Sequence, residues 1–297
     1  MRNLRKILSL VLILALSLTI LSGCQNKQQA PADQPGEEAP AEETPDKENA
    51  DAKPTKGKIS VAASYTPHAE ILGQVKDILA EQGYELEVVE FSDYVQPNMV
   101  VDAGDLDANF FQHKPYMDNF NEENGTKLVS VAPIHYEPLA VYAGKSSDLA
   151  NIPEGGSIAV PNDTTNEARA LLLLQNNGLI KVKEGAGLAA TKNDIVENPH
   201  NIEIVELEAA QVSRVISEVD FVVLNGNYAI DAGLNISDAI TLEEQDSEAA
   251  QTYANIIAVK EGNEDKEEIK ALVAALKSDE IKKFIKERYE GAVVAID

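Results

Sequence analysis

The sequence predicts an α/β fold of two lobes joined by a two-segment hinge. Two series of alternating strand and helix patterns follow one another along the chain. Residues 58–297 are long for one domain and comfortable for two. Two extended apolar segments flank the second series, as they would if the chain crossed to a second lobe once and returned once.

The first series is a strand, a helix and a strand. Residues 58–64 (KISVAAS) have the pattern of a strand, and Thr66 followed by Pro67 is typical of a helix start. Gly83 ends the helix, and residues 85–91 (ELEVVEF) alternate as in a second strand, which favours a parallel sheet. The helix presents an apolar stripe of Ile71, Val75, Ile78 and Leu79.

The second series repeats this arrangement. A strand at residues 157–160 (SIAV) precedes a helix at about residues 165–177, and strands follow at residues 202–207 (IEIVEL) and 221–224 (FVVL). These patterns indicate a second α/β lobe. Two C-terminal helical stripes, which we expect to cover a sheet, comprise Ile269, Leu272, Val273 and Leu276, then Ile281, Phe284 and Ile285.

The apolar segments 138–143 (PLAVYA) and 253–259 (YANIIAV) are interpreted as the two crossovers of the hinge. Lobe 1 then comprises residues 58–137 and 253–297, and lobe 2 comprises residues 138–252. The alternative, which periodicity leaves open, is that both segments are internal strands of one large sheet. Ligands of open α/β sheets bind beyond the carboxyl ends of the strands, so two such lobes would share a ligand cleft.

The N-terminus has the pattern of a signal peptide. Residues 1–23 carry basic residues and no acid, and their apolar run is short for a membrane span of about 20 residues. The run ends in Leu-Ser-Gly-Cys24, which resembles the bacterial lipobox, in which the cysteine is diacylated and the chain is cut before it. Two or more acyl chains anchor a protein stably, so we expect a lipid anchor at Cys24. The alternative is a chance cysteine after an ordinary signal peptide.

Composition restricts the remaining classes of function. Cys24 is the only cysteine, so the chain forms no intramolecular disulfide. Residues 24–57 hold five prolines and almost no large apolar side chain, which predicts a flexible acidic tether. The net charge of −25 at pH 7 argues against nucleic acid and anionic lipid heads as partners.

Aromatic residues make up only 5% of the chain, yet they gather in the stretch GDLDANFFQHKPYMD. Phe111, His113 and Tyr116 follow a strand-like segment there, and Tyr94 lies just after the preceding strand. We expect these four residues to line an apolar slot with polar tips, in loops at the carboxyl edge of the sheet. Taken singly, each has a structural explanation: Phe110 and Phe111 cannot both face one way in a strand, so at least one belongs to a core.

A second group of candidates lies in PNDTTNEAR, where capping residues separate a strand from an apolar helix. Asn166 and Arg169 are three residues apart near the helix start, so their side chains share a face. A helix N-terminus favours an anion, and a guanidinium binds a carboxylate with two hydrogen bonds. Asn225 adds an amide at the end of another strand. The alternative is that Arg169 pairs with Glu167 or a surface acid. Rings from one lobe and an arginine from the other suit an amino acid.

Longer motifs carry a resemblance to a known family. The segments FSDYVQPN, GDLDANFFQHKPYMD, SIAVPNDTTNEARALLLLQNNGLI, DIVENPHNIEIVELEAAQ and VLNGNYAIDAGL resemble, in the same order, the methionine-binding lipoproteins of ABC importers, the NlpA type. The resemblance implies a two-lobed, periplasmic-binding-protein-like fold that holds methionine, with its thioether among aromatic residues and its carboxylate on an arginine. Carried over by motif, the ligand-binding residues are Tyr94, Phe111, His113, Tyr116, Asn166, Arg169 and Asn225.

The resemblance also implies the cellular setting. The protein is expected to be a monomer that is lipid-anchored outside the cytoplasm, on the outer face of the plasma membrane or in a periplasm. Its partners would be an ABC permease and the ATPase of that permease. It implies neither a cofactor nor enzyme activity, and the sequence lacks a Gly-x-Ser-x-Gly elbow, a phosphate loop and a His-Glu-x-x-His motif.

Several alternatives remain at this stage. Gly226 and Asn227 stand where many relatives have small hydroxyl residues, so a methionine-containing dipeptide, D-methionine or another amino acid stays open as the ligand. A surface lipoprotein that binds only macromolecules would leave the predicted pocket unused. A metal-binding importer component is the remaining alternative, with zinc held by His68, His113 and His135 together with Glu70 or Glu137.

Overall fold

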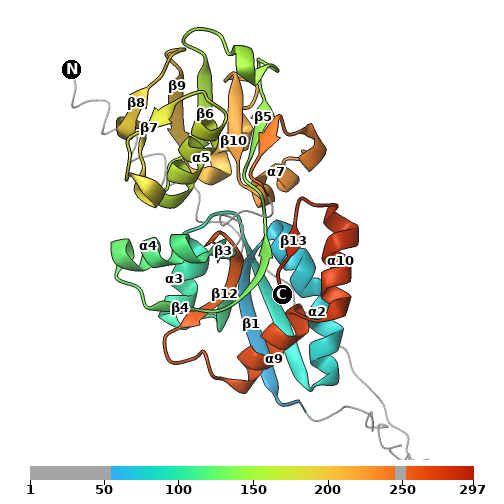
Figure 1. The fold of residues 1–297 in the computed structure, drawn as a ribbon. Helices are drawn as coiled ribbons and strands as arrows, with labels where there is room; N and C mark the ends of the chain where they lie inside the picture. The colour runs from blue at the N-terminus through green and yellow to red at the C-terminus, as the bar shows by residue number, and fades with distance from the viewer. Residues whose placement is uncertain (1–54, 245–251) are drawn as a thin grey trace, which may run out of the picture. The chain divides into compact units, whose positions relative to one another are not determined.

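The computed structural model describes residues 55–244 and 252–297. Their strands form two main sheets, each packed against helices, so the predicted two-lobed α/β fold is confirmed (Figure 1). The predicted signal peptide, Cys24 and all but the end of the predicted tether lie outside the described residues. Within the described ranges, no helix combines the length and the apolar character needed to cross a membrane.

Lobe 1 is built on a sheet that has six strands among the described residues, in the order β13-β4-β12-β3-β1-β2. Strand β1 runs parallel to both β2 and β3, as predicted for the first strand-helix-strand unit. Strand β12 runs antiparallel between β3 and β4, so the sheet is mixed. The strands are β1 (Gly57–Ser64), β2 (Tyr84–Phe91), β3 (Ala108–His113), β4 (Leu128–Tyr136), β12 (Asn255–Lys260) and β13 (Val294–Ala295).

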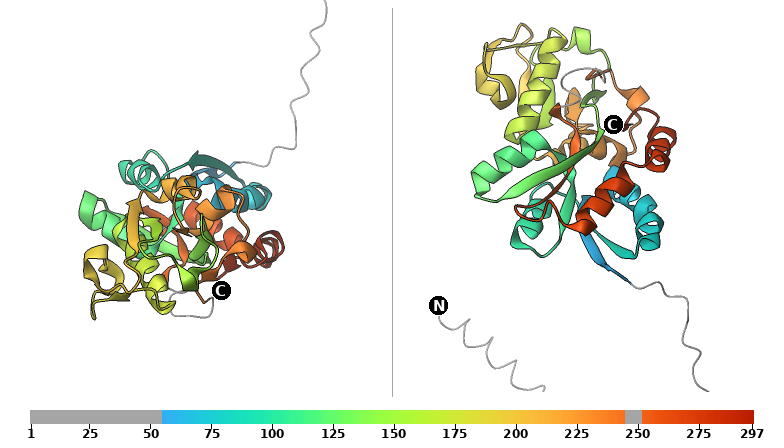
Figure 2. Two further views of the ribbon diagram at one scale, coloured as in Figure 1. Left: turned by 90° about the horizontal axis from the view of Figure 1, so that it is seen from above. Right: turned by 60° about the horizontal axis from the view of Figure 1, so that its bottom comes forward.

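Helices pack on both faces of this sheet. One face carries α2 (Glu70–Glu81), α9 (Glu267–Leu276) and α10 (Asp279–Tyr289), which lie side by side (Figures 1 and 2). The predicted C-terminal stripes do cover a sheet, because Leu272 and Ile281 are fully buried in its core together with Ile71. The other face carries α3 (Gln96–Ala103) and α4 (Lys114–Asn124), where Val101 and Met117 pack on the sheet.

Lobe 2 is built on a second sheet, whose order among the described residues is β11-β5-β10-β6-β9. Side chains of β10 alternate between two cores: Phe221 and Val223 pack beneath α5, whereas Val222 and Leu224 face α6 and α7. The elements are β5 (Ala140–Ala143), β6 (Ser157–Pro161), α5 (Thr164–Asn176), β7 (Lys181–Val182), β8 (Ile195–Glu197), β9 (Glu203–Leu207), α6 (Ala209–Val212), β10 (Phe221–Leu224), α7 (Gly226–Asp231) and β11 (Thr241–Leu242), with β7 and β8 paired separately.

The two apolar segments interpreted as crossovers form strands in the structure. Residues 140–143 form β5, antiparallel to β10 in lobe 2, and residues 255–260 form β12 in lobe 1. The chain passes between the sheets just before each strand, after β4 ends at Tyr136 and after β11 ends at Leu242. Both segments are apolar because each is an inner strand of its sheet, which leaves few polar positions.

Two predicted boundaries at the start of the body are wrong. Strand β1 begins at Gly57, and the Lys56 N–H donates to the Gly83 carbonyl (2.7 Å), so the last residues assigned to the tether belong to the body. Thr66 does not cap the first helix, since α2 begins at Glu70 after an irregular turn at Tyr65–Ala69. Thr66 is extended (φ −125°, ψ 135°), the conformation favoured before a proline.

Strand β3 is longer than predicted and decides between the two phenylalanines. It runs to His113 and is buried throughout between β1 and β12, so Phe111 and His113 lie on a strand rather than a loop. Phe110 is fully buried in the core of lobe 1, and its ring contacts those of His68 and His135. Phe111 therefore points to the opposite face.

Candidate ligand-binding site

All seven residues predicted to bind a ligand line one pocket between the two lobes. The pocket has an empty volume of about 330 Å³, which includes space open to solvent. Its lining includes five residues that were not predicted to bind a ligand. The lining comprises Tyr94, Phe111, Gln112, His113, Tyr116, Glu137, Asn166, Arg169, Asn225, Gly226, Asn227 and Asn255.

Aromatic rings form the lobe 1 wall of the pocket. The ring of Tyr94, which follows β2, lies 5.6 Å from that of Phe111 on β3 and 5.7 Å from that of Tyr116 on α4. Tyr116 Oη donates to the Tyr94 carbonyl (3.1 Å), which fixes the two residues to each other. Burial raises the pKa of Tyr94, so its hydroxyl stays neutral and donates to Asn227 Oδ1 (2.5 Å). The wall is thus apolar, with a polar tip directed at lobe 2.

A polar chain joins His113 to the two predicted asparagines. His113 Nδ1 accepts from the backbone N–H of Tyr116 (3.1 Å), which leaves the proton on Nε2. His113 Nε2 lies 3.1 Å from Asn166 Oδ1, which also accepts from Asn225 Nδ2 (2.9 Å). Burial lowers the pKa of His113 to about 3, so the imidazole is neutral. The sequence predicts these three residues from separate motifs, and in the fold hydrogen bonds connect them across the two lobes.

Arg169 has a partner that the sequence did not indicate. Its Nε donates to Glu243 Oε1 (2.7 Å) and its Nη2 donates to Glu243 Oε2 (2.5 Å), while Nη2 also reaches the Glu137 carbonyl (2.9 Å). The proposed alternative partner Glu167 instead accepts from the backbone N–H of Lys192. Burial opposes both charges, but their mutual attraction outweighs it: the pKa of Arg169 is raised and that of Glu243 is lowered. Both groups are therefore ionised.

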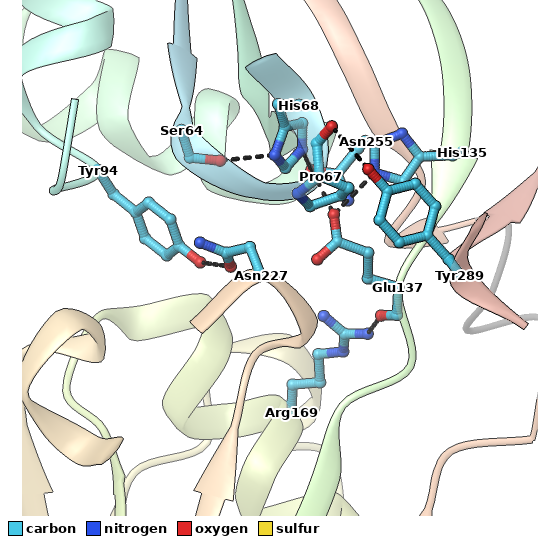
Figure 3. A network of polar contacts seen from close by, with 10 residues as sticks. All are labelled: Ser64, Pro67, His68, Tyr94, His135, Glu137, Arg169, Asn227, Asn255 and Tyr289. Carbon is cyan, nitrogen blue, oxygen red and sulfur yellow. Dashed lines mark hydrogen bonds and ion pairs between the residues drawn. The ribbon is translucent and has the colours of Figure 1, made fainter. Parts of the chain in front are cut away.

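The same pocket contains polar atoms that lack partners. Asn225 Oδ1 and Asn227 Nδ2 are buried, and neither makes a hydrogen bond to any described residue. Arg169 Nη1 donates to none of the described residues, and Figure 3 shows it on the side of the guanidinium away from the Glu137 backbone carbonyl, below the Glu137 carboxylate. Most buried polar atoms in folded proteins are paired. One free acceptor and two free donors around a small pocket indicate a ligand with both kinds of polar group.

The two lobes are in contact around this pocket. Tyr94 Oη donates to Asn227 of lobe 2, and Tyr228 Oη donates back to the Ser92 carbonyl of lobe 1 (3.2 Å). The His113–Asn166 contact crosses the same boundary. The structure is therefore that of the closed form, and a ligand would enter only after the lobes separate.

Sequence reasoning missed Glu137, Asn227 and Glu243 as parts of the site. Glu137 was considered only as a metal ligand, although its position between β4 and β5 places it where the chain leaves lobe 1. Asn227 follows the predicted Asn225 by two residues and was noted only as a departure from relatives. Glu243 lies beside Glu244 in an otherwise unremarked acidic segment, and only the need of a buried arginine for an acid could have suggested it.

The structure brings together part of the set considered for zinc. One ligand atom from each of His68, His135 and Glu137 lies within 4.8 Å of the others, whereas His113 contacts Asn166. His135 Nε2 and Glu137 Oε1 are 2.7 Å apart, which is a hydrogen-bond distance. Two ligands of a tetrahedral zinc with bonds of about 2.0–2.1 Å lie about 3.3 Å apart. Metal-bound histidines also donate from their other ring nitrogen, but His135 Nδ1 has no partner among the described residues.

Glu70, the other acid considered for zinc, lies apart from this set. Its carboxylate accepts from Tyr289 Oη (2.8 Å) and pairs with Arg288 on the surface of lobe 1. The remaining trio is therefore better described as a buried hydrogen-bonded network than as a metal site.

Comparison with known proteins identifies the family of the chain. The family model described as NlpA lipoprotein matches residues 59–296, nearly all of the described part of the chain. The chain belongs to the NlpA lipoprotein family. Membership of this family supports the expectation of a solute-binding protein rather than an enzyme.

Three relatives illustrate the range of this NlpA lipoprotein's similarity. The crystal structure of a lipoprotein from Ruminococcus gnavus is 63% identical, with a TM-score of 0.80, over 81% of this chain and 99% of that one. A nutrient binding protein from Burkholderia cenocepacia, solved bound to methionine, is 46% identical, with a TM-score of 0.77, over 80% and 100% of the two chains. The D-methionine-binding lipoprotein MetQ of Salmonella typhimurium is 45% identical over 71% of this chain and 78% of its own.

The ion pair of this NlpA lipoprotein generates a prediction about stability. Replacing Glu243 by Leu leaves the charge of Arg169 buried, so the change should lower the free energy of unfolding by about 3–5 kcal/mol. Replacing both partners, Arg169→Met with Glu243→Leu, removes the unpaired charge and should cost less than Glu243→Leu alone. Urea denaturation of the purified mature protein measures both. A double variant as unstable as the sum of the single changes would show that the two side chains do not depend on each other.

Proposed function

We propose that this NlpA lipoprotein captures methionine, with L-methionine as the favoured form, in the pocket between its lobes and delivers it to an ABC importer. The observation that carries the proposal is the combination of an aromatic wall with unpaired polar atoms of both kinds in one closed pocket. The methionine-bound relative from Burkholderia cenocepacia supports the choice of amino acid.

The polar atoms support one orientation of the ligand. Asn227 Nδ2 is buried without a partner among the described residues, and Arg169 Nη1 donates to none of them, so both suit the oxygens of the α-carboxylate. Asn225 Oδ1 is a free acceptor and suits the α-ammonium group. Both ends of a zwitterion would then bind at the lobe 2 side of the pocket, leaving the side chain to extend toward lobe 1.

The ring cluster suits a thioether side chain. Tyr94, Phe111 and Tyr116 have centroid separations of 5.6–6.1 Å, which leaves ring edges as well as faces toward the pocket. Sulfur contacts with ring edges contribute about 0.3–1.5 kcal/mol each, and burying a methionine side chain contributes about 1.5–3 kcal/mol. An unbranched side chain also adapts to an irregular slot, which favours methionine over leucine.

Ligand binding between the lobes supports a role in import. A ligand that contacts both lobes stabilises the closed form by its differential affinity for that form. We propose that a membrane permease, driven by its ATPase, receives methionine from the closed monomer. The lipid anchor at Cys24 and the tether that follows it would keep the protein at the outer side of the membrane, within reach of the permease.

Calorimetry with a panel of ligands tests the assignment. We expect L-methionine to bind the purified mature protein and L-leucine to bind at least about tenfold more weakly, because leucine loses sulfur contacts that sum to about 1.4 kcal/mol or more. D-methionine and methionine-containing dipeptides belong in the same panel, since the Salmonella typhimurium relative is named for D-methionine. If none of the methionine compounds gives a binding heat, the proposal is refuted. If a dipeptide binds more tightly than L-methionine, the assigned ligand is wrong but the assigned site stands.

One variant ties this binding to the pocket. Asn227→Ala removes a donor to the ligand and the partner of Tyr94 Oη, so it should weaken L-methionine binding by about 5- to 150-fold, the equivalent of 1–3 kcal/mol. Asn193→Ala is the matched control, because Asn193 is an exposed asparagine of the same lobe outside the pocket. Equal affinities of the two variants would place the ligand elsewhere.

The anchor is tested separately by Cys24→Ala. Without the thiol, no lipid can be attached, so the protein should appear in the soluble fraction or accumulate uncleaved. Membrane fractionation and the mass of the mature N-terminus measure the two outcomes. Normal cleavage with full membrane retention would show that another feature anchors the chain.

A further inference from the structure

Glu137 is the only acidic side chain in the described lining of the pocket. It directly follows β4 and is 5% exposed. Its Oε1 lies 2.7 Å from His135 Nε2 and 3.4 Å from His68 Nε2, both in lobe 1. Figure 3 shows the other oxygen turned away from these imidazoles, toward the space between Asn227 and Arg169. Oε1 is therefore held by the two imidazoles of lobe 1, while Oε2 faces the pocket.

Among the described residues, the Glu137 carboxylate forms no ion pair with a lysine or an arginine. Arg169 pairs through two hydrogen bonds with Glu243, and its hydrogen bond to Glu137 goes to the backbone carbonyl rather than to the carboxylate. Its positive charge still lowers the pKa of the Glu137 carboxyl. Burial lowers the pKa of His68 to about 4 and that of His135 to about 3, so both imidazoles are neutral donors at neutral pH. Arg169 and Glu243 balance each other's charge, so an ionised Glu137 would add an uncompensated negative charge beside the pocket.

Closure of the lobes buries this carboxylate. A Cβ added to Gly226 of lobe 2 would lie 2.8 Å from Glu137 Oε2 and 2.7 Å from Glu137 Cβ, so the backbone at the start of α7 packs directly on the acid. Burial raises the pKa of Glu137, whereas His68, a backbone hydrogen bond from Asn227 and the charge of Arg169 oppose that rise. Burying an ionised carboxylate without a cation is costly, so closure is favoured when a positive charge enters the pocket with the ligand.

We propose that Glu137 is the specificity-determining counter-ion for the α-ammonium group of the ligand, and that this pairing restricts the site to ligands with a free, charged amino group. The inference rests on the proposed function, because it assumes an amino acid in this pocket. Oε2 of Glu137 and the unpaired Oδ1 of Asn225 would both accept from the ammonium group, while Arg169 Nη1 and Asn227 Nδ2 donate to the carboxylate. Methionine derivatives whose nitrogen is acylated or replaced by a hydroxyl lack this charge and leave Glu137 buried and unpaired.

The test combines a change in the ligand with a change in the protein. L-methionine and 2-hydroxy-4-(methylthio)butanoate, in which a hydroxyl replaces the ammonium group, are titrated into the full mature chain and into Glu137→Gln. The parent should prefer L-methionine by about 100-fold or more, the scale of breaking a buried charge pair. In Glu137→Gln the preference should fall to within about tenfold. Glu90→Gln is the control, since Glu90 is an exposed glutamate of the same lobe outside the pocket, and it should keep the parent's preference.

The possible outcomes separate the two proposals. If the parent binds L-methionine and Glu137→Gln keeps the parent's preference, the counter-ion role is wrong and the proposed function stands. If the parent binds the hydroxy acid as tightly as L-methionine, the counter-ion role is wrong whether or not the variant folds. If the parent gives no binding with L-methionine, the proposed function fails and the counter-ion role fails with it.

Discussion

The buried guanidinium of Arg169 contacts both segments that connect the two lobes. Arg169 extends from α5 of lobe 2 and pairs with Glu243, just after β11, where the chain begins its return to lobe 1. It also donates to the Glu137 carbonyl, where the chain first leaves lobe 1. The ring of Tyr253 lies 4.3 Å from its Cζ. One side chain therefore contacts the chain at both connections between the lobes. Removing its partner Glu243 should be strongly destabilising, because the charge of Arg169 would stay buried and unpaired. The other terminal nitrogen of the guanidinium, Nη1, is left for the pocket that Arg169 lines.

The pocket depends on groups whose hydrogen bonds are incomplete. A buried polar atom without a partner costs about 1–3 kcal/mol, and Asn225 Oδ1 and Asn227 Nδ2 both carry that cost in the closed form. Opening the lobes returns these atoms to water, whereas a ligand of complementary polarity satisfies them in place. The closed form is therefore expected to be the ligand-dependent one, and the rigid cores of the two lobes need not change for the switch to occur.

The sequence predicted those features that leave a local signal. Apolar periodicity located both lobes because burial repeats at the spacing of helices and strands, and the ring cluster was visible because its members lie close together in the chain. The partner of Arg169 was not predictable in this way. Glu243 is 74 residues away, and nothing local distinguishes it among the 50 acidic residues of the chain. Asn227 was overlooked because its exposure to the pocket is created by the position of α7. Segments 138–143 and 253–259 are predicted as the hinge because an apolar run does not show in which sheet it lies, and the structure places most of each in a strand.

The central claim is that the side chain of methionine lies among the rings of lobe 1 while its charged groups bind at the polar end of the pocket, where lobe 2 meets Glu137. Selenomethionine offers the most direct measurement, because selenium replaces the ligand's sulfur and scatters X-rays anomalously. Crystals of the unlabelled protein grown with free selenomethionine should show one strong anomalous peak between Tyr94, Phe111 and Tyr116. An anomalous peak at any other place on the protein, or no peak in a closed and otherwise well-defined structure, would contradict the account.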